Sequence, residues 1–215
     1  MNSNTPAPKL SDDVINQIKD FQPIYGCNFP FYNHLTKEQK SLIDELIPNE
    51  ELRKRYKEHG LCKECSQPNT GSHYGNGWCQ SCNSKHFQQD FNKWTSGNKE
   101  IDEFIQKFQL NATCKEEVLE WIPYEKFSDI KYLAKGGFGT VYKAKLIDGF
   151  IIYWDVDQNG WRKYGRNKDV VLKSLNNSQN LNIDILQEVC KFVIYHFCYF
   201  KIEFQFFFLI DFKII

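Results

Sequence analysis

The chain has 215 residues, a length that suits one or two modest domains, each with a workable core. Its 27 basic and 27 acidic residues give a formal net charge of zero. The composition therefore lacks the excess of positive charge that nucleic-acid-binding proteins usually carry, and nucleic acid is not the expected partner.

The first segment, residues 1–35, is expected to be a polar loop segment. Residues 1–9 lack the apolar run of a secretory signal. The protein is therefore expected inside the cell, with the cytoplasm as the favoured compartment and no membrane as partner. In such a reducing compartment, closely spaced cysteines indicate a bound metal more often than disulfides.

Residues 36–60 are expected to be helical. Thr36 and Gln39 have the spacing of a capping box, in which each side chain accepts a hydrogen bond from the other residue's backbone N–H at a helix start. Apolar residues at helical spacing extend this helix to about Ile47. Asn49 then caps a second short helix that reaches Gly60.

Two C-x-x-C pairs dominate the next segment, residues 61–95, and thirteen residues separate them. The pairs are Cys62 with Cys65 and Cys79 with Cys82. Four thiolates at this spacing can converge tetrahedrally on one Zn²⁺, and a closed four-sulfur set makes the metal structural. Metal binding is expected to supply the folding energy of this zinc-ribbon-like module. The alternatives are His73 or His86 in place of one thiol, and four thiols without a metal.

Aromatic side chains accompany two lysines around the second cysteine pair. They are Trp78, Phe87, Phe91 and Trp94, near Lys85 and Lys93. Such residues can stack on nucleic-acid bases, but at these spacings they more often cover a small core. Packing, or docking of a protein partner, is the favoured interpretation.

A helical linker is expected over residues 96–120. Asn98 is placed to cap it. Four apolar side chains fall on one face of that helix, namely Ile101, Phe104, Ile105 and Phe108. After a connector, Phe127 to Leu133 is expected to be the first strand of a sheet, with the linker docked on it.

The segment from Leu133 to Ala144 combines an apolar lead-in, a glycine-rich turn and alternating strand residues. Glycine has no Cβ, so backbone N–H groups in such a turn can approach an anionic ligand closely. Lys173 ends a later β-branched run and can add a point charge to the same oxygens. The pattern predicts a hairpin that covers nucleotide phosphates.

These residues resemble the Gly-rich loop and the lysine strand of the protein-kinase family. Gly136 and Gly139 match the second and third glycines of the family's loop, whereas Ala134 replaces the first. The resemblance implies that Lys173 holds the α- and β-phosphates of ATP and pairs with Glu188 on a following helix. The residues that it places on the nucleotide are Leu133, Ala134, Lys135, Gly136, Gly137, Phe138, Gly139, Val141 and Lys173.

An insert over residues 154–165 separates the second strand from the lysine strand. Asn159 and Gly160, flanked by aromatic residues, are typical of a hairpin turn. Asp155 and Asp157 have the spacing of the first two ligands of a calcium-binding loop, but the glutamate expected later in such a loop is missing. Calcium is therefore not expected.

The tail, residues 190–215, is rich in Phe and Ile and follows neither a helical nor a strand period. A truncated or mis-spliced end is the preferred interpretation, and a membrane-associated tail is the alternative. A catalytic lobe is then expected to be absent, because the tail has no H-R-D, and Asp211-Phe212-Lys213 lacks the glycine of D-F-G.

The sequence as a whole predicts an α+β fold. Helices and a four-cysteine zinc ribbon come first, and residues 121–189 form a mostly antiparallel, kinase-like small lobe with one helix. The family implies ATP with Mg²⁺ and phosphorylation of protein Ser/Thr or Tyr, although this chain is expected to bind ATP without transferring phosphate. The alternative is a non-enzymatic adaptor whose zinc ribbon docks protein or nucleic acid.

Overall fold

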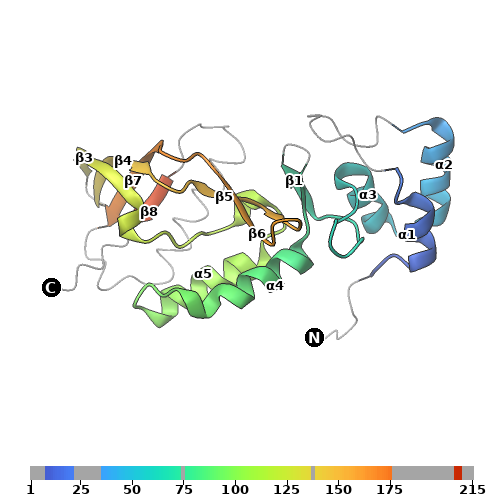
Figure 1. The fold of residues 1–215 in the computed structure, drawn as a ribbon, viewed down its shortest axis with the longest axis horizontal. Coiled ribbons are helices and arrows are strands. Elements are labelled where there is room, and N and C mark those ends of the chain that lie inside the picture. Colours follow the sequence, from blue (N-terminus) through green and yellow to red (C-terminus); the bar gives the residue numbers. More distant parts are fainter. Residues whose placement is uncertain (1–7, 22–34, 74–75, 137–138, 176–205, 210–215) are drawn as a thin grey trace. The chain divides into compact units, whose positions relative to one another are not determined.

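The computed structural model describes residues 8–21, 35–73, 76–136, 139–175 and 206–209 (Figure 1). It has a mixed α and β fold with antiparallel sheets, as expected from the sequence. The chain divides into two compact units. The first comprises residues 1–85, 113–115 and 153–160, and the second comprises residues 86–112, 116–152 and 161–215.

Three helices form the helical part of the first unit: α1 (Asp12–Ile18), α2 (Lys37–Leu46) and α3 (Glu50–His59). Helix α1 lies inside residues 1–35, so the expectation of a polar loop segment there was wrong for this stretch. Ser11 caps α1 by accepting a hydrogen bond from the backbone N–H of Val14. Tertiary packing of Ile15 and Ile18 stabilises a helix too short to persist alone.

The predicted caps of the next two helices are confirmed. Thr36 and Gln39 form both hydrogen bonds of the capping box at the start of α2. Asn49 caps α3 by accepting a hydrogen bond of 2.9 Å from the backbone N–H of Leu52. Gly60 ends α3 with a φ of 66°.

The core of the first unit is formed by apolar residues of the three helices and their flanks. Its buried members are Leu10, Ile15, Ile18, Leu35, Ile43, Ile47, Leu52, Tyr56 and Leu61. Tyr56 is fully buried, and its hydroxyl donates a hydrogen bond of 3.0 Å to the carbonyl of Ile18. Burial raises the pKa of this phenol, so it stays a neutral donor.

A two-stranded antiparallel sheet follows, formed by β1 (Gly71–His73) and β2 (Asn76–Trp78). Helix α4 (Gln80–Asp90) and the short 3-10 helix η2 (Phe91–Lys93) come next. Trp78 is buried, and Phe87 is buried against Trp161 with ring centroids 4.3 Å apart. The packing role predicted for these two aromatic residues is therefore confirmed.

Helix α5 (Lys99–Asn111) begins at the predicted cap, since the side chain of Asn98 accepts hydrogen bonds from the backbone N–H groups of Glu100 and Ile101. Two short 3-10 helices follow, η3 (Lys115–Glu117) and η4 (Tyr124–Lys126). The apolar face of α5 packs as expected. Its cluster comprises Ile101, Phe104 and Ile105, with Trp94, Phe108, Leu119 and Trp121 partly buried against it.

The main sheet has the strand order β3–β4–β7–β8 (Figure 1). Its strands are β3 (Phe127–Gly136), β4 (Gly139–Leu146), β7 (Lys168–Leu175) and β8 (Phe206–Leu209). The first three are antiparallel neighbours, and β8 runs parallel to β7. No strand was expected in the tail, because pairing with a strand far away in the sequence leaves no local period there.

The insert between β4 and β7 forms the predicted hairpin, with strands β5 (Phe150–Asp155) and β6 (Gly160–Tyr164). Asn159 has a φ of 48° in its turn. The linker docks on this region through Glu120, whose carboxylate accepts a hydrogen bond of 2.9 Å from the backbone N–H of Ile151 and contacts Lys163. Ile122 packs against the core of the sheet.

The two faces of the main sheet differ in character. One face is buried and includes Ala144, Leu146, Val170 and Leu172, covered by residues such as Phe150. Because directly paired residues of neighbouring strands share a face, the register assigns the remaining residues to the other face. We call this the lysine face; it includes Lys131, Ala134, Val141, Lys143, Lys145, Asp169, Val171 and Lys173.

Candidate functional site

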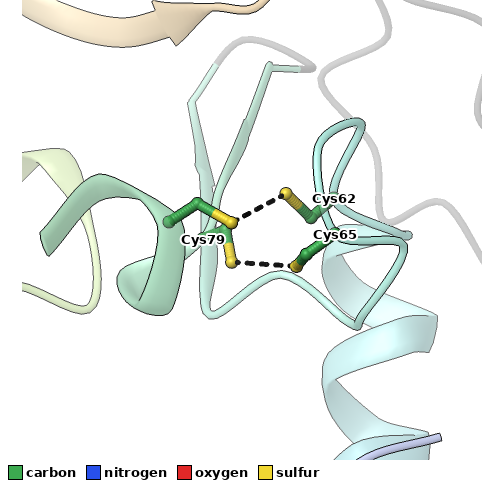
Figure 2. Close-up of side chains that lie close together, drawn as sticks. Cys62, Cys65 and Cys79 are labelled. Atoms are coloured by element: carbon green, nitrogen blue, oxygen red, sulfur yellow. Dashed lines mark hydrogen bonds between the residues drawn. The ribbon is translucent and has the colours of Figure 1, made fainter. Parts of the chain in front are cut away.

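The four cysteines of the two C-x-x-C pairs lie together. Their sulfur atoms all lie within 4.8 Å of one another. The Sγ atoms of Cys62 and Cys82 are 3.9 Å apart, and those of Cys65 and Cys79 are 3.7 Å apart. Figure 2 shows Cys62 and Cys65 on one loop, facing Cys79 on the opposite segment. All four are free thiols, as the zinc prediction requires.

These sulfur separations suit a tetrahedral metal. With Zn–S bonds of about 2.3 Å, the edge of an ideal tetrahedron is about 3.8 Å. The two measured separations, 3.7 and 3.9 Å, lie on either side of that value. Within the described residues, the group that could hold a metal consists of these four cysteines. His86 is not a member, and the side chain of His73 lies outside the described residues.

Local backbone hydrogen bonds shape the first cysteine pair. The backbone N–H of Cys62 donates to the carbonyl of Gln67 at 2.8 Å, and the N–H of Ser66 donates to the carbonyl of Cys62 at 2.9 Å. Ser66 has a φ of 57°, which closes the turn. The N–H of Glu64 donates to the sulfur of Cys62 at 3.4 Å. Such an N–H donor favours the thiolate form that binds metal.

The second pair is positioned by the start of α4. Cys79 immediately precedes the helix and Cys82 lies in its first turn. The backbone N–H of Asn83 donates to the carbonyl of Cys79 at 2.9 Å, which is the first helical hydrogen bond. Residues three apart at a helix start lie on one side, so both sulfurs face the first pair.

The first cysteine loop is also anchored to the helices. The side-chain amide of Gln67 accepts a hydrogen bond of 2.7 Å from the backbone N–H of Leu10 and donates one of 3.1 Å to its carbonyl. The guanidinium of Arg55 donates to the carbonyls of Pro68 and Asn69. The sequence predicts that metal binding supplies the folding energy of this module. The structure adds hydrogen bonds between the first cysteine loop and the helical part of the first unit.

Asn69 links three parts of this unit. It is 3% exposed, and its backbone N–H and side-chain amide donate to the carbonyls of Gly60 and His59, each at 3.0 Å. A Cβ on Gly77 would lie 2.1 Å from the amide nitrogen of Asn69. Sequence reasoning missed Asn69 and Gln67, because both act through contacts with distant segments and carry no local signal.

The electrostatics of the cluster favour a cation. Hydrogen bonds among the thiols raise the pKa of Cys62 and Cys82, mainly through Cys65 and Cys62 respectively. The hydrogen bond with Cys62 lowers the pKa of Cys65 and of Cys79. The crowded sulfurs therefore do not all ionise together, because the raised pKa favours the proton on Cys62 and Cys82 and the lowered pKa favours the thiolate of Cys65 and Cys79. A divalent metal can replace those protons, because it compensates the negative charge of the thiolates.

The predicted nucleotide residues are brought together in part. Strand register pairs Ala134 with Val141 and Val141 with Lys173 on the lysine face, and pairs Gly136 with Gly139 at the hairpin end. Lys135 pairs with Thr140 and so belongs to the opposite face. Leu133 lies in a register shift and is 52% exposed. Gly137, Phe138 and Glu188 lie outside the described residues.

Comparison of the chain with family models, curated proteins and solved structures gives no match. Among the helices that the structure describes, none combines the length and the apolar character needed to cross a membrane.

Proposed function

We propose that Cys62, Cys65, Cys79 and Cys82 bind one structural Zn²⁺. The observation that carries the proposal is that the four sulfur atoms lie within 4.8 Å of one another, with two separations, 3.9 and 3.7 Å, close to the edge of a ZnS₄ tetrahedron. Four thiolates complete the coordination of Zn²⁺ and leave no position for a reacting water, so the ion holds the two cysteine pairs together and takes no part in a reaction.

Metal analysis of the purified full chain tests this function. We expect one equivalent of zinc and protection of the four thiols from alkylation until a chelator is added. Cys114 is a described cysteine outside the cluster, so its alkylation in the same sample reports general thiol access. Zinc below one equivalent, with the four thiols freely alkylated, would refute the proposal.

We further propose that the β3–β4–β7 part of the main sheet binds ATP with Mg²⁺, in the manner of a protein-kinase small lobe. The supporting observation is the register, which pairs Val141 with Lys173 beside the Gly136–Gly139 hairpin end. Lys173 is half-buried and belongs to the face opposite the apolar core, where a phosphate can reach its ammonium. In the family that these residues resemble, the reaction is phosphorylation of proteins.

A thermal-shift titration separates nucleotide binding from an adaptor role of the zinc module. Saturating ATP with Mg²⁺ is expected to raise the melting temperature of the chain by several degrees, and Lys173→Met is expected to abolish that shift. Lys168→Met is the matched control, because Lys168 lies on the same strand but pairs with Leu146 on the core face. The absence of an ATP shift in the unsubstituted chain would favour the adaptor, in which the zinc module docks a protein.

A further inference from the structure

The lysine face carries an unusual concentration of positive charge in a chain that is neutral in total. Lys131 and Lys143 are direct cross-strand partners, and Lys145 lies on the same face two residues further along β4. Like charges directly opposite each other destabilise a sheet. All three ammonium groups reach solvent: Lys131 is exposed, and the side chains of Lys143 and Lys145 are 50% and 41% exposed.

Asp169 shows what these lysines can hold. Its carboxylate oxygens form ion pairs with the Nζ atoms of Lys143 at 2.8 Å and Lys145 at 3.2 Å. Hydrogen bonds from these two ammonium groups hold the pKa of Asp169 below its ordinary value. One carboxylate thus forms ion pairs with two lysines. Lys131 forms no ion pair within the part of the chain that the structure describes. The lysine face therefore keeps unneutralised positive charge.

We propose that this face docks an extended, acidic segment of a partner protein, whose Asp and Glu carboxylates contact Lys131, Lys143 and Lys145. The surface shares no residue with the zinc cluster. It lies on the same face as the proposed nucleotide residues Val141 and Lys173, but its charged contacts are Lys131, Lys143 and Lys145. Lys143 and Lys145, two residues apart on β4, are separated by about 7 Å, which is the spacing of side chains on one side of an extended peptide.

The chemistry of the face favours a protein over a nucleic acid. Val141 and Val171 lie among the lysines and offer contacts to apolar side chains of a peptide. Nucleic-acid binding draws on many phosphate contacts and a broad excess of basic residues, whereas this chain has zero formal net charge.

Fluorescence anisotropy of a labelled oligoglutamate peptide, titrated with the full chain at low salt, tests the proposal. The double variant Lys131→Glu/Lys143→Glu is expected to bind about tenfold more weakly, because two attractive contacts become repulsive. Lys99→Glu/Lys107→Glu is the matched control: it makes the same charge change at exposed positions of α5 and is expected to alter affinity far less.

A second substitution is expected to act in the opposite direction. Asp169→Asn removes the carboxylate that engages Lys143 and Lys145 and should tighten peptide binding by about threefold. Asp44→Asn is its control, since Asp44 also lies between two basic side chains, Arg53 and Lys57, but in the helical unit. This gain of affinity tests the surface even if the double variant does not fold.

Three results would overturn the proposal. One is equal binding by the lysine-face variants and their controls, and another is unchanged affinity in Asp169→Asn. The third is an RNA oligonucleotide that binds more tightly than the peptide with the same dependence on Lys131 and Lys143, which would assign the face to nucleic acid.

Discussion

Replacing Gly149 with alanine is expected to lower the free energy of unfolding of the second unit by about 3 kcal/mol or more. Gly149 lies in the turn between β4 and β5 with a φ of 74°. A Cβ there would lie 2.2 Å from the carbonyl oxygen of Tyr164 and 2.7 Å from its carbonyl carbon. These are backbone atoms of the neighbouring hairpin, so they cannot rotate away as a flexible side chain would. Chemical denaturation followed by intrinsic fluorescence measures the loss.

Gly97→Ala provides the matched control for this substitution. Gly97 has a φ of 82°, but no atom lies within 4 Å of its ideal Cβ position. The control therefore keeps the backbone strain of a left-handed alanine, about 1 kcal/mol, and omits the clash. Equal losses in the two variants would show that the steric contact at Gly149 contributes nothing.

Replacing Cys79 with serine is expected to weaken zinc binding by about a hundredfold or more, because one of four thiolate ligands is lost. Cys79 is buried with its sulfur 3.7 Å from that of Cys65, and within the described residues the group that could hold a metal consists of the four cysteines alone. Competition with a colorimetric chelator measures the affinity, and circular dichroism follows the helices in the same samples.

Cys114→Ser is the control for the cysteine substitution, since Cys114 is a free cysteine outside the cluster. It should leave the zinc affinity unchanged. Because Gln67 and Arg55 tie the first cysteine loop to the helical core, Cys79→Ser should retain most helical signal after metal loss. Unfolding of α1, α2 and α3 on metal removal would contradict this expectation and show that zinc also stabilises the helices.

The features predicted correctly from the sequence are those set by short-range chemistry. The caps at Thr36, Asn49 and Asn98 depend on a side chain reaching an N–H two or three residues away. The hairpin at Asn159 depends on one residue with positive φ, which Asn tolerates well. The two C-x-x-C pairs predicted that four cysteines come together, and the structure confirms a cluster that could hold a metal, because ligand type and spacing are what such a site requires.

The features missed depend on residues far apart in the chain. Helix α1 has only seven residues, and its local signals are weak without the packing of Ile15 and Ile18. The contact between Asn69 and Gly77 exists only because β2 passes the end of α3 closely. Strand β8 is defined by its parallel pairing with β7. None of these leaves a period or motif in the sequence.

The glycine-rich segment illustrates both cases. Its hairpin and its neighbouring lysine strand were predicted from glycine and β-branched residues, and the register pairs Val141 with Lys173. The register shift at Leu133 was not predicted, because bulges depend on how two strands fit together. This shift places Lys135 opposite Thr140 on the core face, away from Lys173. The predicted set of nucleotide contacts is therefore reduced by one lysine.

X-ray absorption at the zinc edge of the purified full chain tests whether four thiolates hold a single zinc ion. We expect four sulfur neighbours at about 2.3 Å and no lighter atom among the atoms bound to zinc. Nitrogen or oxygen neighbours would show that a histidine, a carboxylate or water replaces a thiolate. That result, or a purified chain without bound zinc, would contradict the four-cysteine centre.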